Sequence, residues 1–140
     1  MFIDASAVVA ILAREPGHEA LRARLEAAGE PSFVSPVVRF EACLALARVK
    51  AAGAGLKPSP GLIAQAIATF DAFVEDLEAE EVPITPEIGR SAVAASAAWG
   101  KAVGHPADLN FGDCFSYACA RALGTALLYK GDDFSRTDLA

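Results

Sequence analysis

The chain lacks any apolar stretch that approaches the roughly 18–20 residues needed for a membrane-spanning helix. The apolar run that precedes Arg48 is interrupted by Arg39 and Glu41, and the run after Gly89 consists largely of alanine and serine. The first residues, Met-Phe-Ile-Asp4, contain no basic group and carry a carboxylate early, which is atypical of a secretory signal. We therefore expect a cytoplasmic protein that does not associate with membranes.

Cysteine and histidine are also scarce. Cys43, Cys114 and Cys119 form neither an even set nor a Cys-x-x-Cys pair, which predicts buried thiols in a reducing compartment. His18 and His105 are far apart, and neither has a cysteine or a second histidine at ligand spacing. A zinc site of the nitrogen and sulfur type is therefore not expected.

Positive charge is limited as well, because 12 lysines and arginines are outnumbered by 18 aspartates and glutamates, giving a net charge of −6. Proteins that bind nucleic acids usually carry excess positive charge, so this balance argues against a simple binder of that kind. An enzyme built on clustered carboxylates is the exception, because metal ions can lie between it and phosphate groups. With 54% hydrophobic and 21% charged residues, the chain is not disordered and is expected to form one domain over residues 1–140.

Three hydroxyl–proline pairs, Ser35-Pro36, Ser59-Pro60 and Thr85-Pro86, predict helix starts, because each places a capping oxygen before a proline at the first helical position. Ser6 and Asn110 are the expected caps of two further helices. Short apolar strands are expected at residues 1–4, 33–34, 81–84 and 125–129. Helices are expected at residues 7–14, 17–27, 36–50, 60–79, 86–102 and 111–122.

Short apolar strands that alternate with helices predict an α/β fold with a mainly parallel sheet flanked by helices. Ligands in such folds bind outside the carboxyl ends of the strands. Asp4 ends the first expected strand, and Asp132 and Asp133 follow the last one. The expected architecture therefore places carboxylates at the edge where ligands bind.

Two further acids lie in unusually apolar surroundings. Glu41 occupies a helix whose positions three and four residues away hold only valine, leucine and alanine, so no local cation neutralises it. It either shares a narrow solvent stripe with Arg48 or faces a polar pocket. Asp113 is flanked by phenylalanine and cysteine, and it can form a capping box with Asn110. An acid in such a first turn can serve as a cap and as a ligand.

Each acid also has an ordinary explanation, since Asp4 can cap the first helix and Asp132 and Asp133 can be turn residues. Together, however, these acids are expected near one edge of a small domain. Neighbouring carboxylates raise one another's pKa, and a hard divalent cation such as Mg²⁺ or Mn²⁺ relieves their repulsion. Such a site can activate water and stabilise a phosphoryl group during transfer.

Four segments carry a family resemblance. They are Met-Phe-Ile-Asp4-Ala-Ser6-Ala, Phe40-Glu41-Ala, Leu109-Asn-Phe-Gly-Asp113-Cys-Phe-Ser-Tyr-Ala and Leu127-Leu-Tyr-Lys-Gly-Asp132-Asp133-Phe-Ser-Arg-Thr-Asp-Leu. In this order they resemble the signatures of PIN-domain proteins, and among these the VapC toxins of bacterial type II toxin–antitoxin systems. The resemblance implies a PIN-like three-layer sandwich and a Mg²⁺- or Mn²⁺-dependent endoribonuclease that inhibits translation and growth.

The resemblance also implies roles for individual residues. Asp4 and Asp113 take the positions of the central metal ligands, and Glu41 completes the shell with a fourth acid after the last strand. Asp133 is favoured over Asp132 for that fourth position, because the aspartate before phenylalanine recurs in this subgroup. Ser6 matches the hydroxyl that supports the first acid.

Partners are implied in the same way. RNA needs local cations, and the candidates lie close in sequence to the acidic segments; they are Arg14, Arg39, Lys130 and Arg136. A cognate VapB antitoxin is expected in an apolar groove made by the early helices, with a basic side chain directed toward the acids. Apolar stripes over residues 60–79 and 86–102 exceed what one small sheet can bury, so an exposed patch and a homodimer are expected.

Other functions fit less well. A haloacid dehalogenase phosphatase needs a second aspartate two residues after the first, and that position is Ser6. A phospho-accepting receiver domain needs an aspartate at the end of a middle strand, and residues 82–85 contain none. A degenerate PIN domain that acts only as a binding partner is the alternative from a different class, and the retained acids argue against it.

Overall fold

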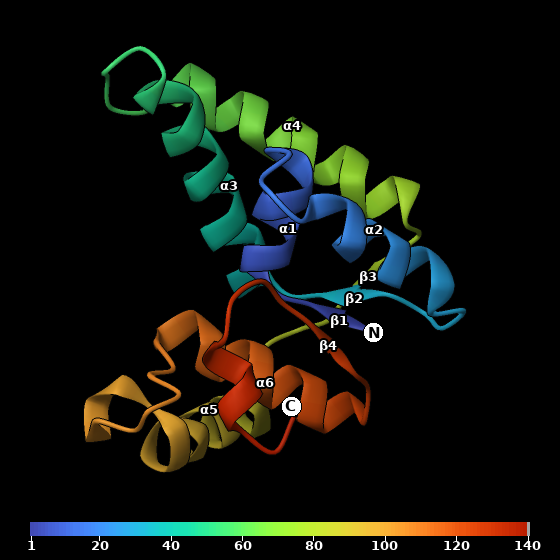
Figure 1. Cartoon of the computed structure of the whole chain (residues 1–140), viewed down its shortest axis with the longest axis vertical. Helices are drawn as coiled ribbons and strands as arrows, with labels where there is room; N and C mark the ends of the chain where they lie inside the picture. Colours follow the sequence, from blue (N-terminus) through green and yellow to red (C-terminus); the bar gives the residue numbers. More distant parts are fainter. Residues whose placement is uncertain (140) are drawn as a thin grey trace.

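A computed structural model describes residues 1–139, which form a three-layer α/β sandwich (Figure 1). The middle layer is a four-stranded sheet in the order β3-β2-β1-β4, and every strand pair is parallel. The strands have two residues each: β1 (Phe2–Ile3), β2 (Phe33–Val34), β3 (Glu80–Glu81) and β4 (Leu127–Leu128). The predicted α/β class with a short parallel sheet is confirmed.

The helices fall into two groups that cover opposite faces of this sheet (Figure 1). One group consists of α1 (Ala5–Leu12), α2 (His18–Ala27), α3 (Pro36–Ala52) and α4 (Pro60–Asp76). The other contains α5 (Pro86–Trp99) and α6 (Phe111–Leu123), together with two short 3₁₀ turns, η1 (Lys101–Val103) and η2 (Asp133–Arg136). Within residues 1–139, no helix is both long enough and apolar enough to cross a membrane.

The predicted helix starts at the hydroxyl–proline pairs are confirmed. The side chains of Ser35, Ser59 and Thr85 each accept a hydrogen bond from a backbone amide three residues on. The start of the first helix was predicted wrongly, because α1 begins at Ala5 and its N-cap is Asp4 rather than Ser6. The carboxylate of Asp4 accepts a hydrogen bond from the amide of Ser6, so the helix begins two residues earlier than expected.

Two other boundaries differ from the sequence predictions. The third strand is Glu80–Glu81 instead of residues 81–84, because its pairing is fixed by backbone hydrogen bonds to Ser32 and Val34. The helix expected to run to residue 102 ends at Trp99, and the chain continues as the 3₁₀ turn η1. The backbone at Gly100 is extended, which ends the α-helix at that point.

Most of the apolar stripe of α4 packs against the rest of the protein. Ala66, Phe70 and Phe73 are buried, because α4 packs along α3, and only Ile67 of its large apolar residues is exposed. The α4 part of the expected exposed patch is therefore mostly buried. Part of the second stripe is exposed, because Val93 of α5 lies with the exposed Val103 and Phe111 where α5, η1 and α6 meet.

Candidate active site

The carboxyl end of β1, the middle of α3 and the first turn of α6 surround an open groove of about 640 Å³. Asp4 follows β1, Glu41 projects from α3, and Asp113 is the third residue of α6. These three acids are far apart in sequence but line one groove. We call this hollow the acidic groove. Its other polar lining residues are Ser6, Glu15, Arg48, Asn110 and Lys130.

Asp4 is held firmly but is not fully satisfied. It is only 3% exposed, and its Oδ2 accepts hydrogen bonds from the backbone amide of Ser6 at 2.8 Å and from the Ser6 hydroxyl at 2.5 Å. The Ser6 hydroxyl in turn accepts a bond from the amide of Lys130 at 3.0 Å, which ties β1 to the loop after β4. The other oxygen of Asp4, Oδ1, is buried without a hydrogen-bond partner among the described residues. A buried polar atom of this kind calls for a ligand.

Asp113 both caps α6 and lines the acidic groove. Its Oδ2 accepts a hydrogen bond from the amide of Asn110 at 2.8 Å, and its own amide donates to Asn110 Oδ1 at 3.1 Å, which completes a capping box. Burial raises the pKa of Asp113 to about 6, and the charges of Asp4, Asp133 and Asp108 act in the same direction. The hydrogen bond from Asn110 opposes this shift. The cap therefore orients the carboxylate while its surroundings disfavour its negative charge.

Glu41 lies against the backbone of α6 at Gly112. A Cβ atom added to Gly112 would lie 2.0 Å from Oε2 and 2.1 Å from Oε1 of Glu41, so only glycine leaves room for this carboxylate. Burial raises the pKa of Glu41 to about 7, with further contributions from Asp4 and Asp113. Of the two interpretations of Glu41, the structure favours the polar pocket over a solvent stripe. Sequence reasoning missed Gly112, whose only signal was its place before Asp113.

The two acids after β4 lie at the border of the groove. Asp133 begins η2 and is exposed, and its charge contributes to the raised pKa of Asp113. Asp132 is the residue before η2 and makes no such contribution. Neither side chain lines the acidic groove in this structure. Of the two, Asp133 is thus the one that is electrostatically coupled to the site.

The donor set of the acidic groove fits a hard divalent cation. Within residues 1–139, no three acidic, histidine or cysteine side chains converge in an arrangement ready to hold a metal ion. The groove nevertheless offers only carboxylate oxygens as strong donors, which is the chemistry that Mg²⁺ and Mn²⁺ prefer. The unpartnered oxygen of Asp4 is available to a cation, and burial together with neighbouring acids raises the pKa of Glu41 and of Asp113, so a cation would be stabilising here.

The predicted RNA-binding cations are placed differently from one another. Lys130 lines the acidic groove and forms an ion pair with Glu15. Arg14 lies in a different hollow beside Arg22 on α2. Arg136 is exposed, and its Nη1 donates a hydrogen bond to the carbonyl oxygen of Pro106 at 3.2 Å.

Arg39, the remaining predicted RNA-binding cation, makes contacts within the protein. It pairs with Asp71 at 2.5 Å and with Glu81 at 2.6 Å, and its guanidinium lies 4.7 Å from the centre of the Phe70 ring. Hydrogen bonds to both carboxylates raise its pKa above the usual value. The prediction placed Arg39 near the acids because of its sequence position, but this side chain joins α3 to α4 and β3. Arg48, which was considered only as a solvent-stripe residue, lines the groove.

Comparison with known proteins places the chain in a family. Residues 1–139 match the PIN domain family. A VapC ribonuclease of Rhizobium meliloti is 49% identical over 139 residues, which cover 99% of this chain and 98% of that protein. Ribonuclease VapC42 of Mycobacterium tuberculosis is 32% identical over 140 residues, which cover 99% and 96%.

A solved structure shares the fold. The crystal structure of Mycobacterium tuberculosis VapC20, described as a toxin that cleaves the sarcin–ricin loop, matches with a TM-score of 0.67. The match covers 96% of this chain and 92% of that one at 19% sequence identity. The two proteins therefore share the arrangement of strands and helices, although their sequences have diverged widely.

Proposed function

Because the chain belongs to the PIN domain family, as a VapC ribonuclease toxin of a toxin–antitoxin system, we propose that it is a Mg²⁺- or Mn²⁺-dependent endoribonuclease whose chemistry takes place in the acidic groove. The observation that carries the proposal is the buried, unpartnered Oδ1 of Asp4, which lies in one groove with Glu41 and Asp113. A hydrolytic site for RNA needs a positive group at this position, because three carboxylates alone would repel the phosphate.

Each acid of the site has its own role in this proposal. Asp4 and Asp113 would hold the cation, and Glu41 and Asp133 would complete its surroundings, in part through water; Asp132 is the alternative to Asp133. When bound, the cation supplies the charge that acidifies a water molecule and stabilises the transferring phosphoryl group. Burial and the charges of Asp4 and Asp113 raise the pKa of Glu41 to about 7, so a cation bound beside it would favour its charged form. In-line attack by the water oxygen on phosphorus would break the bond to the 3′ oxygen. The attacking water would lose its proton to solvent and the leaving 3′ oxygen would take one from solvent, which leaves a 5′-phosphate and a 3′-hydroxyl.

The test is cleavage of a fluorescently labelled RNA by the purified full chain. EDTA should abolish cleavage, Mg²⁺ or Mn²⁺ should restore it, and Zn²⁺ should restore it poorly, because an all-oxygen site prefers hard ions. Asp4→Asn and Asp113→Asn should each abolish cleavage while the fold persists, and Glu75→Gln on α4 serves as a matched control. Full activity in excess EDTA would contradict the metal requirement. An inactive wild-type chain would favour the degenerate, binding-only alternative.

An antitoxin site is proposed in a second hollow of about 610 Å³ between α1, α2 and α4. Its apolar lining includes Ile11, Leu25 and Phe73, which fits the apolar face of a VapB-type helix. A basic side chain of the same antitoxin then reaches the acidic groove and blocks it. Ala72→Arg fills this hollow with a charged side chain, so it should prevent copurification with the cognate antitoxin while leaving RNA cleavage unchanged.

A homodimer is proposed through the remaining apolar surface. A hollow of about 750 Å³ lies between α5, η1 and the start of α6, and its lining is mainly apolar. Val93 is 72% exposed there and Phe111 is 70% exposed. A second copy that covers this face removes these side chains from water, which is the usual reason for an apolar patch of this kind.

A further inference from the structure

Phe40 is an exposed aromatic residue on the wall of the acidic groove. It immediately precedes Glu41 in α3, and its side chain is 66% exposed although it lines the groove that holds the three acids. Single exposed apolar residues are common on protein surfaces and need no explanation by themselves. The position of Phe40 is different, because a planar apolar group here borders the place where an RNA phosphate has to bind.

Along α3, the acidic groove adjoins another hollow, which is positively charged and distinct from the proposed antitoxin site. This hollow has a volume of about 640 Å³ and shares Leu44 and Arg48 with the acidic groove. It is also lined by Lys57, and no acid is among its described lining residues. Arg48 and Lys57 are both exposed. The surface thus changes from acidic at Glu41 to basic at Lys57.

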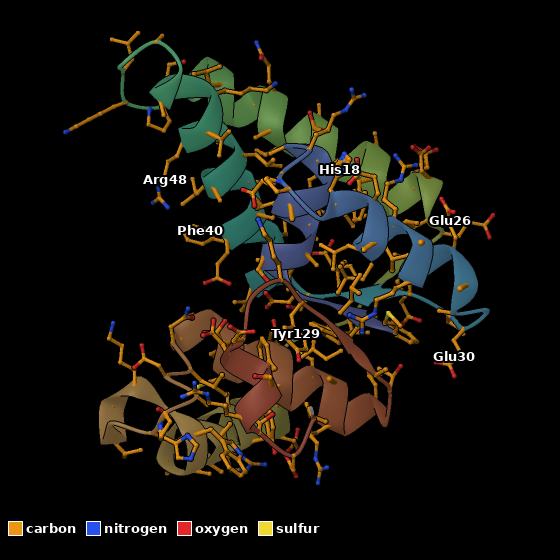
Figure 2. All side chains as sticks on the ribbon, viewed as in Figure 1. His18, Glu26, Glu30, Phe40, Arg48 and Tyr129 are labelled. Atoms are coloured by element: carbon orange, nitrogen blue, oxygen red, sulfur yellow. The ribbon has the colours of Figure 1, made fainter. Side chains whose placement is uncertain are left out.

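The helix geometry places these groups in one line. Phe40, Leu44 and Arg48 are spaced four residues apart, so they occupy one stripe of α3. At 1.5 Å per residue, Phe40 and Arg48 are separated by roughly 12 Å along the helix axis. Figure 2 shows the two side chains projecting from the same side of α3.

We propose that Phe40 is a base-stacking residue for the RNA substrate and that Arg48 and Lys57 bind the phosphates of the strand as it leaves the acidic groove along α3. This inference rests on the proposed function. An aromatic ring stacks on an unpaired base irrespective of its sequence, whereas bases inside a duplex are not accessible for such contact. The RNA segment next to the cleaved bond is therefore single-stranded, and it runs from the acids toward the loop between α3 and α4.

This path explains how a chain with a net charge of −6 holds RNA. Lys130 is the cation within the acidic groove besides Arg48, and it is paired with Glu15. Arg48 and Lys57 are not among the ion pairs of the described residues, so their charge is available to phosphates. Binding is therefore expected to depend on these two side chains more than on the overall charge.

The experiment measures RNA binding separately from cleavage. Fluorescence anisotropy follows a labelled single-stranded oligouridylate and a base-paired RNA duplex on the Asp4→Asn chain, in Mg²⁺ buffer at several salt concentrations. Phe40→Leu should weaken binding of the single strand about 5- to 100-fold, since stacking contributes strongly per base, and should change duplex binding little. Phe40→Trp should retain the affinity. Leu123→Ala removes an exposed apolar side chain at the end of α6, away from the groove, and serves as the control.

The salt dependence identifies the phosphate contacts. Arg48→Gln and Lys57→Gln should each reduce the slope of log K against log salt by about 0.7, whereas Phe40→Leu should leave the slope unchanged. Arg24→Gln on α2 is the matched control and should alter neither slope nor affinity. A change in slope is not produced by a merely structural effect, because it counts the ions released when RNA binds.

The outcomes separate this inference from the proposed function. If wild type cleaves RNA but the Phe40, Arg48 and Lys57 variants bind and cleave like the controls, the path along α3 is wrong and the acidic site stands. If wild type fails to cleave, the proposed function is wrong, and the binding series still decides whether RNA follows α3. Equal losses for single-stranded and duplex RNA with Phe40→Leu would overturn the stacking role.

Discussion

Replacing Gly112 by alanine tests whether the position of Glu41 governs activity. The new Cβ would lie 2.0 Å from Glu41 Oε2, and ordinary contact begins near 3.4 Å, so the carboxylate has to withdraw by about 1.4 Å. The neighbour that has to move is the flexible end of a side chain, and Gly112 lies in the first turn of α6. Alanine also favours the helix over glycine by up to about 1 kcal/mol. The variant should therefore fold with equal or greater stability.

Its activity should fall sharply. A misplacement of about 1 Å can reduce a catalysed rate on the order of 100-fold, so we expect a loss of that size for Gly112→Ala in the cleavage of labelled RNA. Urea unfolding, followed by circular dichroism, measures stability on the same samples. The control is Gly89→Ala, because a Cβ at this α5 position meets no atom within 4 Å. It should retain full activity.

A double-mutant cycle shows whether the loss acts through Glu41. In a Glu41→Gln chain the carboxylate is already impaired, so adding Gly112→Ala should reduce cleavage little further, and the two losses should not be additive. Fully additive losses would show that alanine disturbs α6 or Asp113 instead. Wild-type activity in Gly112→Ala would refute the requirement for Glu41 at its observed position.

Three further predictions concern stability and assembly. In metal-free buffer, the free energy of unfolding should fall as the pH rises from about 4.5 to about 7, because the raised pKa values of Glu41 and Asp113 make the folded chain bind more protons than the unfolded chain; Glu41→Gln should flatten this dependence in urea titrations. Arg39→Ala should lower the free energy of unfolding by about 1–2 kcal/mol, because it removes a partly exposed pair with Glu81 and a cation–π contact; equal stability in the same titration would contradict this. Val93→Glu should convert a dimer into a monomer by light scattering, and wild type should stay dimeric at high salt, because apolar burial is not screened.

Local signals predicted the fold well because they act over a few residues. The capping hydroxyls at Ser35, Ser59 and Thr85 start their helices through contacts three residues away, so the sequence alone identifies them. The apolar strands were recognisable in the same way. The predicted range of the third strand was wrong, because pairing with β2 determines where this strand lies. The positions of Asp4 and Asp113 at a strand end and a helix start followed from these elements.

Contacts between distant segments were not predictable. Arg39 was expected to contact RNA, but its partners Asp71 and Glu81 lie 32 and 42 residues away in sequence. The fit of Glu41 against Gly112 joins α3 to α6 and appears in no local pattern. The stripe of α4 seemed excessive for one sheet because the sequence does not show that α3 covers it. In each case a tertiary partner determines the role.

The acidic groove favours a positively charged group, which either a metal ion or a basic side chain can supply. Asp4 Oδ1 has no hydrogen-bond partner among the described residues, and the charges of Glu41 and Asp113 are disfavoured by burial. Under the proposed function, a divalent cation would supply this charge and prepare the groove for a phosphate. A basic side chain of the proposed antitoxin would supply it equally, but it would occupy the space that the phosphate needs. Because both would compete for the same oxygen atoms, we expect activity and inhibition to exclude each other without any change in the fold. The cations along α3 lie outside this competition, so RNA bound there can remain in contact with the chain while the acidic groove is blocked.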